Sequence, residues 1–230
     1  MTTPEPPTTT EPRAPLSRER VLRAAVRLAD ESGFASLSMR KLGHELGVQA
    51  MSLYNHVGGK DDIRDGIVDL VLQEVALPPA GADWKRAIRT SAISAHDVFV
   101  AHPWACGLIN STKAVSSARL DWMEAILRTL REAGCSANLT HHAYHALDSH
   151  ITGFTLWQVS FPFEEWGDLE ELAATFLHTL PVSKYPYLAE HVREHLAEPG
   201  PEEKSEFEFG LDLILDGIER IRDAASPPDA

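Results

Sequence analysis

The sequence has few cysteines, no long apolar run and no overall positive charge. Cys106 and Cys135 are its two cysteines among 230 residues, and they match neither a metal-binding nor a redox spacing. The longest apolar stretch, residues 98–109, is interrupted by His102 and Pro103, which argues against a membrane span. The N-terminus lacks the basic start and apolar core of a secretory signal. These absences predict a cytoplasmic protein without disulfides and without membrane contact.

The net charge of −13 is unfavourable for binding nucleic acid, but it is distributed unevenly. Between Arg13 and Lys60 there are eight Lys or Arg against four Asp or Glu, whereas residues 77–230 hold twelve against twenty-three. This asymmetry predicts a basic module attached to an acidic body. A modest excess of positive charge is also typical of an ordinary solvated face, so charge alone leaves both interpretations open.

The spacing of apolar residues predicts an all-α fold, because no alternating strand pattern is present. The Pro/Thr-rich residues 1–15 form a disordered tail in this interpretation, and residues 16–76 form a first domain of four helices. The sequence LPPAGAD makes residues 77–83 a linker, and residues 84–225 form a second domain. The expected helices are 17–33, 38–47, 49–56 and 60–76, then 84–101, 116–133, 138–161, 169–180, 187–197 and 202–225.

Residues 38–63, SMRKLGHELGVQAMSLYNHVGGKDDI, have the features of a helix-turn-helix. Gly43 supplies a small residue where two helices cross, Gly47 supplies the turn, and apolar neighbours hold the pair together. The second helix would then expose polar and apolar side chains that can contact base edges and phosphates. The residues that carry these side chains are Gln49, Ala50, Met51, Ser52, Tyr54, Asn55 and His56. A two-helix corner with a glycine and no DNA remains the alternative on residue types alone.

The segments MRKLGHELGV and SLYNHVGGKDDI, preceded by the 17–33 helix, resemble the DNA-binding module of the TetR family of transcriptional repressors. Further segments, LPPAGADWKRAI, SHITGF at 149–154 and FEFGLDLILDGIE at 207–219, resemble the tetracycline-repressor branch and its C-terminal domain. The resemblance implies a homodimer that binds a palindromic operator and releases it when a small molecule occupies the C-terminal domain. It implies no enzymatic activity and no cofactor.

The resemblance also implies roles for individual residues of the module. Arg40 would meet a phosphate or a guanine edge, and Ser52, Tyr54, His56 and Lys60 would hold the DNA backbone. For Tyr54 we expect the ring to pack in the module core while its hydroxyl reaches phosphate. The expected base readers are Gln49, Ala50, Met51 and Asn55. The tetracycline repressor has Gln, Pro and Trp where this chain has Ala50, Met51 and Asn55, so we expect a different operator.

For the ligand site, the resemblance places Ser91 and Ala95 where the tetracycline branch has Asn and Phe. No histidine lies near Ile109, where that branch would hold a metal, so tetracycline with magnesium is not the expected ligand. We expect a small and largely apolar effector, although the same residues at helical spacing are also typical of a core. The other expected ligand-binding residues are Phe99, Trp104, Leu108, Trp122, Ile126, His150, Phe154 and Trp157.

Two helices are candidates for a dimer interface. An apolar seam at alternating spacings of four and three runs through Phe207, Leu211, Ile214, Ile218 and Ile221. The helix at 138–161 offers Ser149, Thr152 and Gly153 for close approach, with Leu156 nearby. The resemblance suggests that both helices pair with their copies as a four-helix bundle. A single helix covering the core of its own domain would explain the seam nearly as well.

The segment THHAYHALDSH at 140–150 raises an alternative function. His141, His145 and Asp148 are spaced to share one helix face and have ligand chemistry suited to zinc or non-haem iron. A helical metal-dependent enzyme or metal-binding module would use that face. No further ligand segment is visible, and no nucleophile elbow, phosphate loop or paired-carboxylate motif stands out, so we favour surface histidines and predict no metal site.

Overall fold

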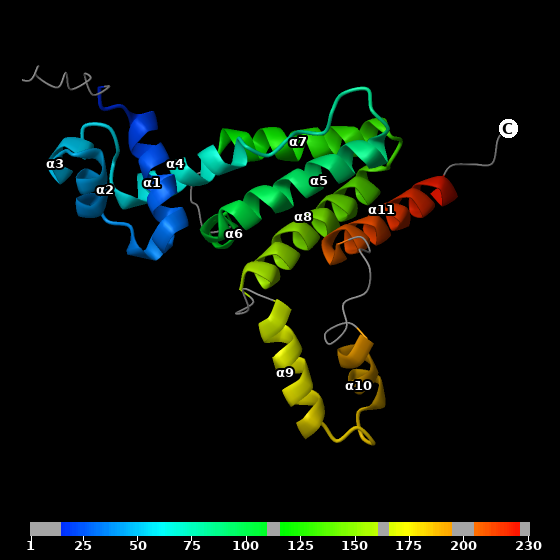
Figure 1. Ribbon diagram of the computed structural model, residues 1–230. Coiled ribbons are helices and arrows are strands. Elements are labelled where there is room, and N and C mark those ends of the chain that lie inside the picture. Colours follow the sequence, from blue (N-terminus) through cyan, green and yellow to red (C-terminus); the bar gives the residue numbers. More distant parts are fainter. Residues whose placement is uncertain (1–14, 110–115, 161–165, 195–204, 226–230) are drawn as a thin grey trace, which may run out of the picture.

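The computed structural model describes residues 15–109, 116–160, 166–194 and 205–225, and within them all regular structure is helical (Figure 1). The prediction of an all-α fold is therefore confirmed. No helix among the described residues combines the length and apolar character needed to cross a membrane.

The N-terminal module consists of α1 (Arg18–Ser32), a short 3-10 turn (Phe34–Ser36), α2 (Met39–Leu46) and α3 (Ala50–Leu53). Ser17 and Ser38 begin α1 and α2 as predicted, since their side chains accept hydrogen bonds from the backbone N–H groups of Arg20 and Lys41, each at 3.2 Å. The three α-helices and the first half of the next helix enclose a small core. Its fully buried members include Val21, Ala24, Ala25, Leu42, Leu53, Ile63 and Ile67.

Helix α4 (Lys60–Leu72) belongs to both cores of the molecule. Ile63 and Ile67 pack into the core of the module, whereas Val68 and Val71 pack into the larger core of the body. α4 ends four residues earlier than predicted, because the chain turns after Leu72. α3 is also shorter than the predicted 49–56 and continues as hydrogen-bonded turns toward His56.

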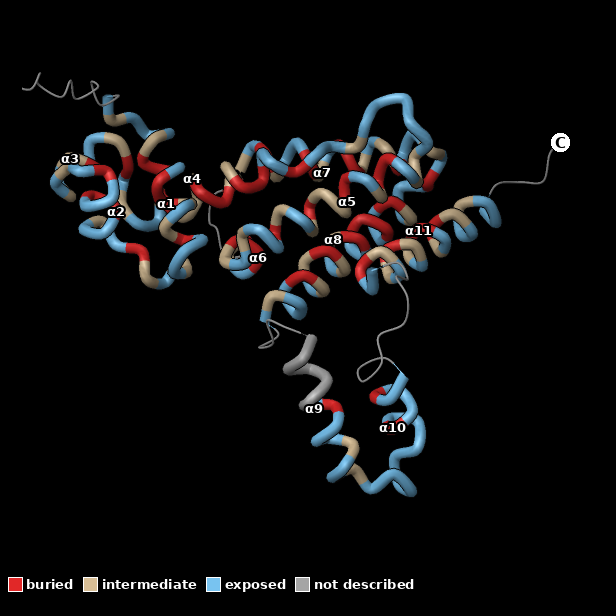
Figure 2. The backbone as a smooth tube through the Cα atoms, in the orientation of Figure 1, coloured by how far each residue is buried: buried red, intermediate tan, exposed pale blue. Residues whose placement is uncertain are grey.

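The body is built from α5 (Trp84–Ala101), α6 (Pro103–Leu108), α7 (Ser117–Glu132), α8 (Ala137–Val159) and α11 (Glu206–Ala225). α8 contacts the other four helices and has α11 along one side (Figure 1). Burial follows this arrangement, with buried residues lining the surfaces where these helices meet (Figure 2). The sequence did not predict α6, in which Pro103 occupies the first turn, where its missing N–H is tolerated.

Helices α9 (Trp166–Thr179) and α10 (Pro186–Val192) form a hairpin that projects from the body (Figure 1). Most of its described surface is exposed, including several large apolar side chains (Figure 2). These are Leu172, Phe176, Val182, Tyr185, Tyr187 and Leu188.

Candidate nucleic-acid interface and ligand site

The crossing of α2 and α3 depends on two glycines. A Cβ atom added to Gly43 would lie 2.9 Å from the Val48 carbonyl oxygen, so a side chain there would force the helices apart. Gly47 ends α2 in the left-handed region, with φ 65° and ψ 36°, which favours glycine. The backbone N–H of Val48 then bonds to the Gly43 carbonyl at 2.8 Å. The turn predicted from the sequence thus brings α3 close against α2.

One side of α3 and of the turn that follows it is exposed to solvent, whereas the other side packs into the module core. Leu53 and Val57 are buried in the module core. Gln49 precedes α3 at its N-cap position, and Met51 is 74 % exposed. The other predicted contact residues range from exposed to half-buried on the same short segment: Ala50, Ser52, Tyr54, Asn55 and His56. Tyr54 is 51 % exposed, which corrects our expectation that its ring packs in the core.

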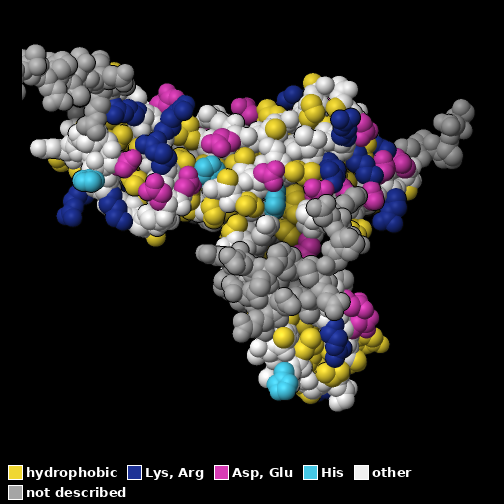
Figure 3. Space-filling view, in the orientation of Figure 1, with side chains coloured by type: hydrophobic (Ala, Val, Ile, Leu, Met, Phe, Trp, Pro, Cys, Tyr) yellow, Lys and Arg dark blue, Asp and Glu magenta, His cyan; other side chains and the backbone are white. Residues whose placement is uncertain are grey.

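Two positive side chains lie beside this face. Arg40 is exposed on the first turn of α2, and Lys60 is exposed on the first turn of α4. Lys60 lies over the Phe34 ring, 5.0 Å from its centroid, and donates to the Ala35 carbonyl at 3.4 Å. Lys and Arg side chains are visible at several points on the module (Figure 3). Helix N-termini with nearby cations are favourable positions for phosphate.

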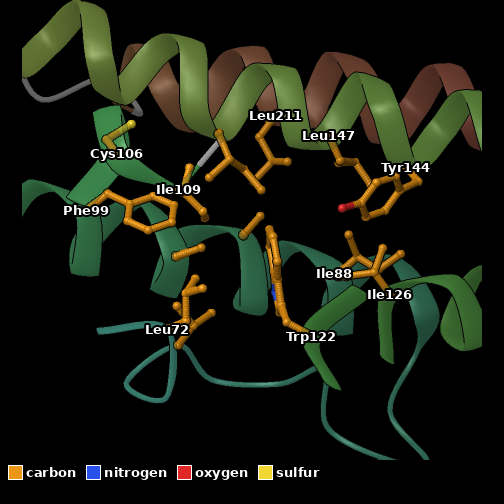
Figure 4. Close-up of a cluster of buried hydrophobic side chains, with 14 of the residues drawn as sticks. Leu72, Ile88, Phe99, Cys106, Ile109, Trp122, Ile126, Tyr144, Leu147 and Leu211 are labelled. Carbon is orange, nitrogen blue, oxygen red and sulfur yellow. The ribbon is translucent and has the colours of Figure 1, made fainter. Parts of the chain in front are cut away.

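Five of the predicted ligand-binding residues lie in the central core of the body. Ser91, Ala95 and Phe99 come from α5, whereas Trp122 and Ile126 come from α7, and all five are buried. Phe99, Trp122 and Ile126 are labelled in Figure 4. Leu108 and Phe154 pack against this core from α6 and α8. The structure therefore brings these seven residues into one region.

The remaining three predicted ligand residues lie at the edge of this region, because His150 and Trp157 contact the Phe154 ring and Trp104 packs against the same core. Trp104 donates a hydrogen bond to Asp30 of α1 at 2.7 Å and so belongs to the boundary with the module. Trp157 is 54 % exposed on α8. The ring of His150 stacks on Phe207 with centroids 4.9 Å apart, and its Nε2 lies 2.9 Å from the Phe207 carbonyl oxygen. His150 thus joins α8 to α11.

A chain of hydrogen bonds connects the central core to the segment after α4. The Trp122 indole donates to Ser91 Oγ at 3.1 Å, and Ser91 Oγ donates to the Ala76 carbonyl at 2.7 Å. The Ala76 N–H in turn donates to Ser94 Oγ at 2.9 Å. These bonds link the Trp122 side chain to the backbone of Ala76, four residues beyond the end of α4.

Sequence reasoning missed a row of polar groups on α8. Thr140 and Tyr144 are 4 % and 8 % exposed, and Asp148 is partly buried one turn further on. Burial, followed by the nearby Asp148 charge, raises the pKa of Tyr144 to about 12. Burial also raises the pKa of Asp148, and Arg119 opposes this shift. The sequence signal that could have identified this row is the occurrence of polar residues at intervals of four on a helix face that is otherwise apolar.

The histidines of the proposed metal face lie on the surface. His141 and His145 are exposed, with ring centroids 4.6 Å apart, whereas Asp148 is partly buried and interacts with Tyr144 and Arg119. In the part of the chain that the structure describes, no three His, Cys, Asp or Glu residues are placed to hold a metal ion together.

The apolar seam of α11 is largely core of its own protomer. Phe207, Leu211 and Ile218 are buried against α5 and α8, which corrects their assignment to a dimer surface, and Ile214 is partly buried. The side of α11 that faces solvent instead carries Phe209, Leu213 and Ile221. On α8, Ser149, Gly153 and Leu156 are exposed and Thr152 is half-buried.

Comparison with known proteins agrees with this architecture. The profile for bacterial regulatory proteins of the tetR family matches residues 21–67, and the profile for the tetracyclin repressor-like C-terminal domain matches residues 77–222. The chain belongs to the TetR family. It is accordingly a helix-turn-helix transcriptional repressor with a ligand-binding C-terminal domain, and its family is not one of enzymes.

Several TetR-family relatives are similar along most of the chain. The HTH-type transcriptional repressor DrrR1 of Streptomyces coeruleorubidus is 29 % identical over 90 % of this chain and 79 % of its own length. The class C tetracycline repressor of Escherichia coli is 29 % identical over 90 % of this chain and 92 % of its own length. The crystal structure of ActR from Streptomyces coelicolor with actinorhodin is 29 % identical, with a TM-score of 0.74, and covers 91 % of this chain and 99 % of that one.

Proposed function

We propose that this repressor binds a palindromic operator as a homodimer and releases it when a small, largely apolar effector enters the central core of the body. The hydrogen-bond chain from Trp122 through Ser91 to Ala76 carries the proposal, because it joins the candidate effector site to the segment that follows α4. The regulator would act in the cytoplasm, where it meets its operator.

In this proposal α3 enters the major groove of each half-site. Gln49, Met51 and Asn55 are exposed and would read bases, together with Ala50, whose methyl group suits a thymine methyl. Arg40 and Lys60 would contact phosphates on either side, with Ser52, Tyr54 and His56. The departures from the tetracycline repressor at Ala50, Met51 and Asn55 support a distinct operator sequence.

The dimer would be formed by the solvent-facing sides of α8 and α11. Phe209 and Leu213 of α11 are large, apolar and exposed, and Ser149 and Gly153 of α8 permit close helix approach. Two α8 and two α11 helices would then make a four-helix interface. A dimer of this kind must hold its recognition helices about 34–36 Å apart, one DNA turn, so a small splay is enough to lose the operator.

An effector would act by shifting Trp122 and its neighbours Phe99, Ile126 and Phe154. Ser91 would transmit that shift to Ala76, and Val71 of α4 packs into the same core as Val75, so the shift would also reach α4. Because α4 also carries Ile63 and Ile67 in the module core, its movement would change the position of α3.

A coupling free energy of about 1–3 kcal/mol between the effector site and the operator site would change operator affinity by about fivefold to 150-fold. ActR, a relative with a structure bound to actinorhodin, supports an effector of the small-molecule class.

The test has two parts. Fluorescence anisotropy with DNA from upstream of its own gene should give salt-dependent binding that a small molecule co-purified with the protein weakens. Linkage requires that the operator lower the affinity for that molecule by the same factor. Equal affinity for the molecule with and without operator would refute regulation through the body, and absence of binding to any upstream fragment would refute the role at that gene.

A further inference from the structure

The inner face of α8 carries polar groups that the protein itself does not satisfy. Thr140 Oγ1 is buried without a hydrogen-bond partner. Among the residues that the structure describes, the Tyr144 hydroxyl and the Asp148 carboxylate likewise have no hydrogen bond or ion pair. The three residues follow one another at intervals of four, so they lie along one side of the helix.

This row contrasts with the other buried polar side chains of the body. Ser91 Oγ makes two hydrogen bonds, and Thr155 Oγ1, further along α8, donates to the Ile151 carbonyl at 2.6 Å. Nearly all buried polar groups in native proteins have partners, because an unsatisfied one costs the free energy of its lost hydration. Thr140 and Tyr144 are buried and Asp148 is partly buried, so the partners of this row must come from outside the protein, from water or from a bound molecule.

The surroundings of the row define the rest of the site. The Tyr144 phenol and the Trp122 indole reach from α8 and α7 into the same region of the core, with Ile126 beside them (Figure 4). Arg119 of α7 acts electrostatically on both Tyr144 and Asp148, and its Nη1 donates to the Ile109 carbonyl at 2.7 Å. A molecule bound here would meet apolar rings on one side and a hydroxyl and a carboxylate on the other.

We infer that the effector is an apolar ring compound that presents a hydrogen-bond donor, a hydroxyl or a protonated amine, to Asp148 and Tyr144. An ionised carboxylate only accepts hydrogen bonds, so Asp148 requires a donor, whereas Tyr144 both donates and accepts. The rings of the ligand would lie against Trp122 and Ile126, and Thr140 would accept or donate at its far end. This inference rests on the proposed function in that it assigns the effector to the body.

The first test needs no ligand. Thr140→Val and Tyr144→Phe remove hydroxyl groups that have no partner in the free protein, so each should leave the melting temperature unchanged or raise it. Thr155→Val is the matched control on the same helix, because it removes a bonded hydroxyl and should lower the melting temperature by about 2–4 °C. A decrease in Thr140→Val and Tyr144→Phe as large as in Thr155→Val would overturn the inference.

The second test uses four probes of similar shape: naphthalene, naphthol, naphthylmethylamine and naphthoate. Calorimetry would give the affinity of each probe for the wild type, Asp148→Asn and Tyr144→Phe. The ratio of naphthylmethylamine to naphthalene affinity should fall about tenfold in Asp148→Asn, because an ionic hydrogen bond is lost. Ratios between variants are informative because they cancel the different hydration of the probes.

The probes also distinguish the two kinds of donor. A fall confined to naphthol in either variant identifies a hydroxyl-bearing effector, and a fall for naphthylmethylamine identifies an amine. Naphthoate should bind least to the wild type and gain affinity in Asp148→Asn. Ratios that do not change in either variant, or the failure of every probe to bind, would overturn the inference. Binding with the expected preferences but without any effect on operator affinity would uphold this site and refute the proposed regulation.

Discussion

The carboxylate of Asp30 on α1 lies 2.7 Å from Nδ1 of His102, the residue between α5 and α6. The same oxygen accepts a hydrogen bond from Trp104, and Nε2 of His102 lies 3.4 Å from Glu74. A carboxylate of the N-terminal module is thus bonded to two rings of the body. This contact is independent of α4 and provides a second constraint on the position of the module.

We expect Asp30→Ala to weaken operator binding by about fivefold or more, the effect of roughly 1 kcal/mol, because two ring nitrogens lose their acceptor and the module is held less firmly. Anisotropy with labelled operator measures this change. Asp97→Ala is the matched control, since it removes an exposed carboxylate that also lies beside a histidine. Wild-type affinity in Asp30→Ala would mean that this contact does not position the module.

Arg40→Ala and Lys60→Ala should each weaken operator binding with little effect on folding. Both side chains are exposed at the beginning of a helix, where phosphate contacts form. Each loss should reduce the slope of log affinity against log salt concentration by about one. Arg128→Ala on α7 is the control, because that exposed side chain lies on the body. An unaltered salt slope in both variants would remove this face from the interface.

Phe209→Glu combined with Leu213→Glu should yield monomers that no longer bind an operator with two half-sites. Both side chains are exposed on α11, so the substitutions leave the protomer core intact while placing charge in the proposed interface. Sedimentation velocity reports the change in mass. Leu120→Glu, an exposed leucine of α7, should remain dimeric. Dimers in the double variant would exclude this side of α11.

Ser91→Ala should weaken the coupling between effector and operator. The substitution leaves the Trp122 indole without its acceptor and the Ala76 carbonyl without a donor, so the free energy of unfolding should fall by about 1–3 kcal/mol. Effector affinity measured with and without operator should then differ less than in the wild type. Thr90→Ala, on the exposed side of α5, is the control. An unchanged difference would show that coupling bypasses Ser91.

Asp148→Asn should change how stability depends on pH. Burial raises the pKa of Asp148 above its ordinary value of 3.8, so the folded protein binds this proton more tightly than the unfolded chain. Its contribution to stability is therefore fully present below 3.8 and is lost as pH rises through the raised pKa. Urea unfolding from about pH 3 to about pH 7 should show the variant gaining stability over the wild type across this interval. A difference independent of pH would contradict this account.

Local sequence signals were sufficient for the helix-turn-helix. Ser17 and Ser38 cap their helices through atoms three residues away, and Gly43 and Gly47 act on neighbours within a few positions. Such interactions depend on short-range geometry, so residue type and spacing identify them. The missed helix α6 and the early end of α4 lie where hydrogen bonds and packing between distant segments decide the local conformation.

The sequence by itself determined that the chain is helical and where the helix-turn-helix lies. It also determined which residues of α3 and its following turn face away from the module core. It could not determine which side of α11 faces outward, because its seam suits both a protomer core and a dimer surface; only packing against α5 and α8 assigned Phe207, Leu211 and Ile218 to the core. Tertiary structure alone also brought Asp30 to His102 and Ser91 to Ala76, and it left the Thr140, Tyr144 and Asp148 side chains without a hydrogen bond from any residue that the structure describes. The first two relationships join residues that are far apart in the chain, and the third depends on which hydrogen-bond partners the neighbouring helices lack. The spacing of apolar residues along the sequence carries no information about long-range contacts or about missing hydrogen-bond partners.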